Sequence, residues 1–224
     1  MPAASPDPNE ALAPFYGPDE DHGGVRRTRF EYSSAGDRVR GILWHAEASD
    51  PTPLVLVGHA RGSSKDAAEL DLLARSWTGA GAAVAAIDLP LHGARASGKL
   101  GDRILRAVGA ETATDELDAD LWRHLVQQTE TDLRRALILL AARPDIDRER
   151  LAFAGFGLGA ELGAGVCTEG SELCAAVLAR LPRSSSVARG TGVATIPLVS
   201  DEITKPASDE AWRHLASGLG LSSD

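Results

Sequence analysis

Side chains that could take part in chemistry gather in four segments, each directly after a short apolar run of the sequence. The segments begin at Gly58, Asp88, Gly155 and Ser200. If the apolar runs are strands of a parallel sheet, all four segments lie at its carboxyl edge, where open α/β sheets bind ligands. The candidates in them are the imidazoles of His59 and His92, the guanidinium of Arg61, the carboxylates of Asp201 and Glu202, and the main chain of Gly157 and Leu158.

Strand and helix patterns around these segments predict the scaffold that would hold them. Five short runs are wholly or mostly apolar, as in strands that are covered on both faces. Segments with apolar residues three and four apart alternate with these runs and predict helices. Because parallel strands need such crossover connections, the predicted fold class is α/β, with a mainly parallel, doubly wound sheet. The predicted strands are residues 54–57, 82–87, 151–154, 174–179 and 195–199, and the predicted helices are residues 66–77, 114–142, 158–166 and 208–217.

The N-terminal part of the chain has a different pattern. Residues 27–32 and 39–44 are strand-like runs around a Gly-containing turn, which predicts an antiparallel hairpin. Residues 1–24 combine Pro, Gly and acidic residues without a sustained period, so we expect an extended or mobile arm there. Residues 25–224 should form a single domain, since a chain of 224 residues is long enough for one core.

Charge and composition narrow the choice of partners. The 23 Lys and Arg residues are outnumbered by 32 Asp and Glu residues, which gives a net charge of −9 and argues against a nucleic-acid partner. The sequence has no apolar stretch of about 18–20 residues and no signal-peptide pattern, so we expect a cytoplasmic protein without a membrane partner. Cys167 and Cys174 lack the spacing of a zinc site or a disulfide framework, and we expect no metal and no cofactor.

Three of the four polar segments also resemble motifs of a known family. Residues 147–159, DRERLAFAGFGLG, resemble the strand–turn–helix nucleophile elbow of the α/β-hydrolases, in particular of the dienelactone-hydrolase-like and acyl-esterase-like branch. Residues 59–62, HARG, resemble the oxyanion turn of that family, and residues 88–93, DLPLHG, resemble its D-x-P-x-H-G segment. The resemblance covers about residues 27–220 and implies an α/β-hydrolase fold.

The sequence departs from the family at the positions of the catalytic residues. The resemblance places the nucleophilic serine of the family at Gly157, which has no side chain. It places the family acid at Asp201 or Glu202 and the family histidine on a later strand that this chain lacks. His214 is the one histidine after the acid, and the predicted last helix turns it toward solvent. The chain therefore looks like a truncated α/β-hydrolase without ordinary serine esterase chemistry, which needs both a nucleophile and a base.

The resemblance still implies a place to bind negative charge. The N–H of Leu158, at a helix start, and that of Arg61, in the oxyanion turn, would donate to a carbonyl or carboxylate oxygen. His59 and His92 could relay protons or hold a metal over this pocket, although histidines at these positions of the family are commonly structural. Residues 95–114 join the second buried strand to the long helix and are a candidate lid.

Three functional hypotheses follow from this pattern. The first is a catalytically degenerate α/β-hydrolase, a pseudoenzyme that binds a small carbonyl or carboxylate ligand, or a protein partner, without covalent chemistry. The second is a non-hydrolytic isomerase, lyase or cyclase that uses the oxyanion hole with Asp201 or Glu202 as its acid. The third is an altered or shortened form of an active esterase. Loss of a final strand would expose a sheet edge, so we also expect a homodimer.

Overall fold

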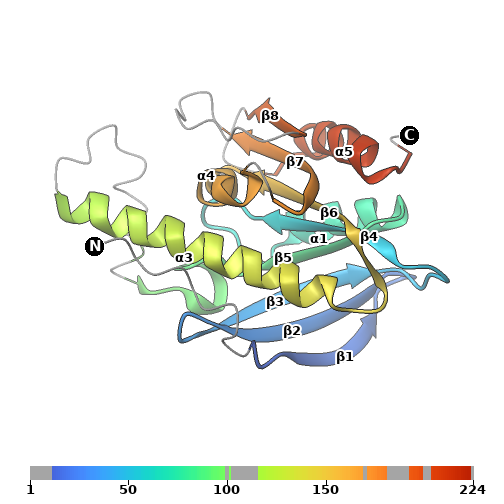
Figure 1. Cartoon of the computed structure of the whole chain (residues 1–224), viewed down its shortest axis with the longest axis horizontal. Coiled ribbons are helices and arrows are strands. Elements are labelled where there is room, and N and C mark those ends of the chain that lie inside the picture. The colour runs from blue at the N-terminus through green and yellow to red at the C-terminus, as the bar shows by residue number, and fades with distance from the viewer. Residues whose placement is uncertain are drawn as a thin grey trace.

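A computed structural model describes residues 12–98, 101, 116–168, 171–180, 192–198 and 203–222 of the chain. Its centre is a sheet of eight strands in the order β1-β2-β3-β5-β4-β6-β7-β8 (Figure 1). The strands are β1 (Phe15–Asp21), β2 (Arg26–Ser34), β3 (Asp37–His45), β4 (Thr52–Gly58), β5 (Ala83–Ile87), β6 (Ile146–Phe156), β7 (Leu173–Arg180) and β8 (Val193–Pro197).

Two kinds of pairing meet within this sheet. Strands β5, β4, β6, β7 and β8 run parallel to one another. Strands β1, β2 and β3 are antiparallel neighbours, and β3 joins them to β5 in an antiparallel register. The predicted α/β fold class, with a parallel sheet and an N-terminal antiparallel hairpin, is confirmed.

Helices cover both faces of the sheet, as the doubly wound pattern predicts. Helices α1 (Ala68–Gly79) and α5 (Lys205–Leu219) pack on one face, and α3 (Glu116–Ala141) and α4 (Leu158–Leu162) pack on the other (Figure 1). Two short 3₁₀ helices, η1 (Gly93–Arg95) and η2 (Ala164–Cys167), complete the described elements. The single helix expected over residues 158–166 is divided between α4 and η2, because the chain leaves helical pairing at Gly163.

Strand β4 shows why the central strands are apolar throughout. Its Val55 and Val57 belong to the core under α1 and α5, whereas Leu54 and Leu56 belong to the core under α3 and α4. Successive side chains of a strand point to opposite faces, so a strand with helices on both sides needs apolar residues at every position. All four side chains are fully buried.

The arm expected over residues 1–24 contains strand β1. Phe15–Asp21 pairs with β2, with a shift of register between Tyr16 and Asp19. The ring of Tyr16 also lies against the guanidinium of Arg143, whose carbon is 5.0 Å from the ring centre. The sheet therefore starts before the expected domain boundary at residue 25, and residues 1–11 lie outside the described part of the chain.

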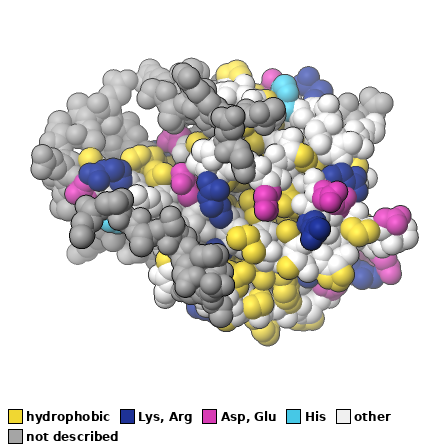
Figure 2. All heavy atoms as spheres, in the orientation of Figure 1, with side chains coloured by type: hydrophobic (Ala, Val, Ile, Leu, Met, Phe, Trp, Pro, Cys, Tyr) yellow, Lys and Arg dark blue, Asp and Glu magenta, His cyan; other side chains and the backbone are white. Residues whose placement is uncertain are grey.

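The surface of the described residues mixes the two signs of charge. On the face shown in Figure 2, acidic and basic side chains are interspersed and do not form large areas of one sign. Among the described helices, none is both long enough and apolar enough to cross a bilayer.

Candidate functional site

The bend between β6 and α4 lies where the sequence predicts it, at Gly157. The residue has φ 52° and ψ −117° and forms the N-cap of α4. Its N–H donates to the carbonyl of Ala179 on β7 at 2.7 Å, and its own carbonyl accepts from the N–H groups of Ala160 and Glu161. A residue with a side chain would be strained in this conformation by about 1–3 kcal/mol, whereas glycine adopts it freely.

Two further glycines let α4 sit close to the strands beneath it. A Cβ atom on Gly159 would lie 2.3 Å from the carbonyl carbon and oxygen of Gly58, and one on Gly155 would lie 2.5 Å from the Cα of Ala160. Both contacts are with main chain, which cannot move aside as a flexible side chain could. This packing brings the start of α4 beside the turn that follows β4. Leu158, the first residue of α4, has no acceptor for its N–H within the helix.

His59, in the turn after β4, is bonded to main chain through both ring nitrogens. Its Nδ1 lies 2.9 Å from the carbonyl oxygen of Ala60, and its Nε2 lies 3.2 Å from the main-chain nitrogen of Leu89. Because the N–H of Leu89 must donate to Nε2, the proton of the neutral ring sits on Nδ1 and is donated to Ala60. Burial lowers the pKa of His59 to about 4. The ring is therefore neutral near pH 7, and both of its nitrogens are engaged within the loops.

His92, in the loop after β5, lies against His59. The two ring centres are 5.2 Å apart and the planes meet edge to face at 63°. Nδ1 of His92 lies 3.0 Å from the carbonyl oxygen of Pro90, two residues earlier in the same loop. The structure thus brings the two predicted histidines together, and the contacts of His59 with Leu89 and His92 join the loops after β4 and β5.

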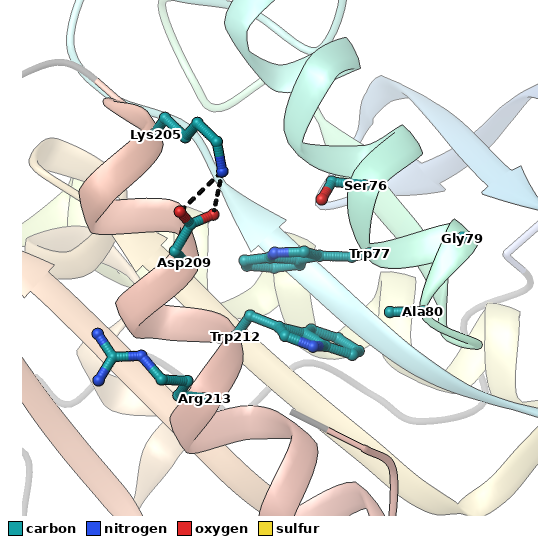
Figure 3. Close-up of a pocket in the computed structure, with 8 residues that line it drawn as sticks. All are labelled: Ser76, Trp77, Gly79, Ala80, Lys205, Asp209, Trp212 and Arg213. Atoms are coloured by element: carbon teal, nitrogen blue, oxygen red, sulfur yellow. Dashed lines mark hydrogen bonds and ion pairs between the residues drawn. The ribbon is translucent and has the colours of Figure 1, made fainter. Parts of the chain in front are cut away.

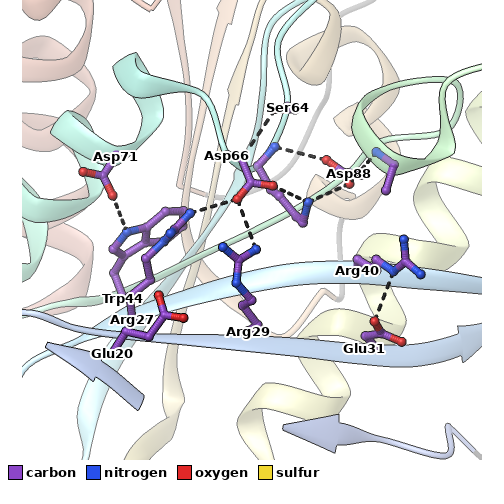
Figure 4. Close-up of polar contacts among 12 residues, drawn as sticks. Glu20, Arg27, Arg29, Glu31, Arg40, Trp44, Ser64, Asp66, Asp71 and Asp88 are labelled. Carbon is purple, nitrogen blue, oxygen red and sulfur yellow. Dashed lines mark hydrogen bonds and ion pairs between the residues drawn. The ribbon is translucent and has the colours of Figure 1, made fainter. Parts of the chain in front are cut away.

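A buried ion pair fixes the same two loops, and sequence reasoning missed it. Nζ of Lys65 lies 2.9 Å from the fully buried carboxylate of Asp88 and 2.5 Å from that of Asp66. Asp88 also accepts hydrogen bonds from the main-chain N–H groups of Lys65 and Ala94. Figure 4 shows Asp66 in the middle of this network, with Arg27 on one side and Asp88 on the other. The D-x-P-x-H-G pattern marked Asp88, but nothing in it identified Lys65 as its partner.

Of the remaining predicted site residues, some lie within the described part of the chain and others lie outside it. Arg61 lies at the turn after β4 and is partly buried. Asp201 and Glu202 lie outside the described residues, as does most of the candidate lid at 95–114, of which residues 95–98 and 101 are described.

Arg95, at the start of the candidate lid, forms ion pairs with Asp37 at 2.8 Å and with Asp132 at 2.7 Å. His214 is exposed on α5, as expected.

A hydroxyl, an imidazole and a carboxylate also lie together at the amino edge of the parallel strands, opposite the edge that holds Gly157. Nε2 of His45, at the end of β3, is 3.1 Å from the hydroxyl oxygen of Thr28, and its Nδ1 is 3.7 Å from a carboxylate oxygen of Asp145. The hydroxyl of Thr28, however, donates to Asp19 of β1, and the residue is only 2% exposed. A hydroxyl that is buried and donates its hydrogen bond to a carboxylate, and not to the imidazole, is not arranged to attack a substrate.

The electrostatics of His45 are those of a structural histidine. Burial lowers its pKa, while the carboxylates of Asp19 and Asp145 act in the opposite direction. The ring therefore joins three segments of the chain, β1, β2 and the turn before β6, mainly in its neutral form. Within the described residues, no group of three or more His, Cys, Asp or Glu side chains is arranged to hold a metal ion.

A groove of about 520 Å³ lies between α1 and α5. Figure 3 shows Trp77 and Trp212 packed together beneath it, with ring centres 5.7 Å apart. Lys205 and Asp209 on its α5 side are paired with each other at 2.8 Å. Arg213 of α5 also lines this groove, which is separate from the histidines of both edges.

Comparisons with known proteins agree with the fold. No protein-family profile and no curated protein sequence matches the chain. Among solved structures, a cold-adapted esterase from an Arctic intertidal metagenomic library is 23% identical with a TM-score of 0.56, covering 73% of this chain and 64% of that protein. The acetyl xylan esterase from Paenibacillus sp. R4 is 19% identical with a TM-score of 0.56, covering 75% of this chain and 53% of the esterase.

A third structure, of a protein named m3DLH, is similar over more of the chain. It is 24% identical with a TM-score of 0.55, and the match covers 89% of this chain and 79% of m3DLH. The fold is that of the α/β-hydrolases. The chain spans between about half and two thirds of the length of the two esterases named above.

Proposed function

We propose that this protein is a catalytically degenerate α/β-hydrolase that binds a small carbonyl or carboxylate compound without covalent chemistry. The observation that carries the proposal is the conformation of Gly157. The residue occupies a sharp strand-to-helix bend with φ 52° and ψ −117° at the carboxyl edge of the sheet. Serine hydrolases with this fold present their nucleophile on such a bend, and here the bend carries no side chain.

The neighbouring groups support the absence of serine-type hydrolysis. Acyl transfer through a hydroxyl needs a base within hydrogen-bonding reach of that hydroxyl. Among the described residues of the two loops, His59 has both nitrogens bonded to main chain and Asp88 is held by Lys65. The hydroxyl–imidazole contact of Thr28 and His45 lies at the other edge of the sheet.

The ligand contacts that we propose come from the bend and the turn beside it. The N–H of Leu158 and the main chain and guanidinium of Arg61 would face a carbonyl or carboxylate oxygen, since such donors suit a developing or full negative charge. His59 and His92 would form the wall between the loops and keep this turn in place. The buried Lys65–Asp88 pair joins the two loops and would keep these proposed contacts in place.

A fluorophosphonate probe together with a panel of activated esters tests the catalytic half of the proposal. We expect no labelling and no turnover above the buffer rate. Labelling would overturn the proposal, and its loss in a Thr28→Val variant would then assign the nucleophile to the amino edge.

The binding half is tested by titrating acetate and following main-chain amide signals by NMR. We expect shifts at Leu158 and at the turn around Arg61, and at least a fivefold weaker affinity in Arg61→Gln. Arg148→Gln, a change of an exposed arginine near the start of β6, is the matched control and should bind acetate as the unaltered protein does. Shifts that avoid the bend, or equal affinity in both variants, would contradict the proposed contacts.

A further inference from the structure

One side of the strands β1, β2 and β3 is left open by the described helices, whereas the other side is packed under α3. On the packed side, Phe30 and Tyr32 of β2 are almost completely buried. On the other side, α1 covers β3 at Trp44, whose Nε1 donates to Asp71 at 2.9 Å. Beside this contact, the same side of the sheet carries charged and aromatic side chains that reach solvent.

The register of the strands shows which side chains share this side. Paired residues point to the same side of a sheet, and so do alternate residues of one strand. Trp44 and Arg40 are four residues apart on β3, so their side chains share the side that α1 partly covers. Glu31 is paired with Arg40 on one flank and with Phe15 of β1 on the other. With their alternate neighbours they form a set that we call the open face, namely Phe15, Arg29, Glu31, Arg38 and Arg40.

The open face is accessible to a partner molecule. Phe15 is 58% exposed, and the side chains of Arg29, Arg38 and Arg40 are 53%, 49% and 51% exposed. Gly17 of β1 lies next to Arg29 and has no side chain that could cover it. Aromatic residues and arginine are the types that protein interfaces favour.

Two arginines of the open face share one carboxylate. Nη2 of Arg38 lies 3.2 Å from one oxygen of Glu31. Nε of Arg40 lies 3.1 Å from the other oxygen (Figure 4). A guanidinium has five N–H groups, so each arginine keeps donors for a second carboxylate. Exposed ion pairs contribute little to stability, so carboxylates of a partner can join or replace this one.

Arg29 also shares its carboxylate with other cations. Its Nη1 lies 3.4 Å from Asp66 (Figure 4). Asp66 is bonded in addition to Arg27 at 2.9 Å and to Lys65 at 2.5 Å. Three arginines against a single glutamate leave the open face with an excess of positive charge. Because the whole chain has a net charge of −9, this surface differs in sign from the protein as a whole.

We propose that the open face docks a short acidic segment of a partner protein. Carboxylates of the segment would pair with Arg29, Arg38 and Arg40, and an apolar side chain beside them would pack on Phe15. Complementary charge favours an acidic partner, whereas the net negative charge of the chain repels a long polyanion such as a nucleic acid. The proposal goes beyond the proposed function, because the open face contains none of the contacts proposed for the carbonyl or carboxylate ligand.

The peptide acetyl-EELEE-amide is the probe, with acetyl-EESEE-amide and acetyl-KKLKK-amide for comparison. Each is titrated by NMR into the full chain, and binding is located by the main-chain amide signals of β2 and β3. We expect EELEE to shift the signals of the open face and KKLKK to leave them unchanged. Raising the ionic strength from about 0.02 M to about 0.3 M should weaken the binding of EELEE at least fivefold, because salt screens exposed charges.

Arg29→Gln and Arg40→Gln test the charged contacts. Asp66 keeps two other cations, and Glu31 keeps one arginine, so both variants should fold. We expect each variant to bind EELEE at least threefold more weakly than the unaltered protein. Arg148→Gln, which changes an exposed arginine of β6 outside the open face, is the matched control and should bind EELEE as the unaltered protein does.

Phe15→Ser tests the apolar contact. The unaltered protein should prefer EELEE to EESEE at least threefold, and this variant should lose the preference while it still binds both peptides. An equal preference in the two proteins would remove Phe15 from the docking site and overturn the proposal in this form.

The remaining outcomes decide which occupant the open face takes. Equal affinity for EELEE in Arg29→Gln, Arg40→Gln and Arg148→Gln, or shifts that avoid β2 and β3, would overturn the proposal. Tighter binding of a short oligothymidylate than of EELEE would assign the face to nucleic acid. A doubled mass in light scattering that is lost in Arg40→Gln would assign it to a second copy of the chain. Acetate binding at Leu158 is measured separately, so failure here leaves the proposed function standing.

Discussion

The two edges of the parallel strands use histidine in different ways. At the carboxyl edge, His59 is bonded through both ring nitrogens to main chain, close to the sharp bend at Gly157, which has no side chain. At the amino edge, His45 lies at the buried end of β3, between the hydroxyl of Thr28 and the carboxylate of Asp145. Residue types suited to acyl transfer and main chain suited to it are both present in this molecule, at opposite edges. Acyl transfer through a hydroxyl would need both at one place, and the described residues do not bring them together.

The largest expected difference between the edges is in stability. Asp88→Ala at the carboxyl edge leaves the ammonium group of Lys65 buried with only the partly exposed Asp66, and should cost about 3–5 kcal/mol. Asp19→Ala at the amino edge removes a half-exposed carboxylate from Thr28 and should cost about 1 kcal/mol. Urea unfolding measures both free energies. Equal costs would mean that the carboxyl edge is not the more rigidly held of the two.

A smaller difference should appear on acidification. The pKa of His59 is lowered from 6.5 to about 4 by burial, so the folded state binds fewer protons than the unfolded state between these pH values. Its contribution to stability is complete above about pH 6.5 and falls as the pH drops toward 4, by about 3 kcal/mol at most. His59→Gln, whose amide can donate to Ala60 and accept from Leu89, should remove that part of the pH dependence.

His45 provides the comparison for this measurement at the amino edge. Burial lowers its pKa in the same direction, but Asp19 and Asp145 favour the protonated ring and oppose the shift. His45→Gln should therefore change the slope of stability against pH by less than His59→Gln does. Unfolding followed between pH 4 and pH 7 tests the order, and a steeper change from His45→Gln would reverse it.

For ester turnover at the bend itself we expect no effect. Gly157→Ser places a hydroxyl at the carboxyl edge at a cost of about 1–3 kcal/mol in backbone strain. Ester turnover should not rise above the buffer rate, because both nitrogens of His59 are already bonded to main chain. Turnover in this variant would show that a base from the remainder of the chain reaches the bend. The carboxyl edge would then have a hydroxyl and a base together.

The fold could be predicted from the sequence where the pattern of apolar residues indicates which faces of an element are buried. The central strands are apolar at every position because helices cover both of their faces, as Val55 and Leu56 of β4 illustrate. Strand β1 was expected only as part of an extended or mobile arm, because its segment FYGPDED has Pro, Gly and three acidic residues. Its pairing with β2 depends on tertiary contacts of Tyr16 and Asp19 that no local pattern contains.

The candidate site could be predicted in outline. The glycine pattern located the bend at Gly157, and the polar segments after β4 and β5 located both histidines. The pairing of Lys65 with Asp88 across 23 positions could not be found in this way, since it depends on how two loops fold against each other. The positive φ of Leu91, 66°, could not be predicted from the sequence either, because leucine gives no local signal for that conformation.

The pairing of β1 with β2 has a consequence for how this protein is expressed and handled. A recombinant form that started at residue 25 would leave β2 as the outermost strand, with a row of unsatisfied main-chain groups along nine residues. It would also remove Asp19 from the hydroxyl of Thr28 and Tyr16 from Arg143. Such a shortened protein would be prone to self-association through that strand, so recombinant versions should retain the residues from Leu12 onward.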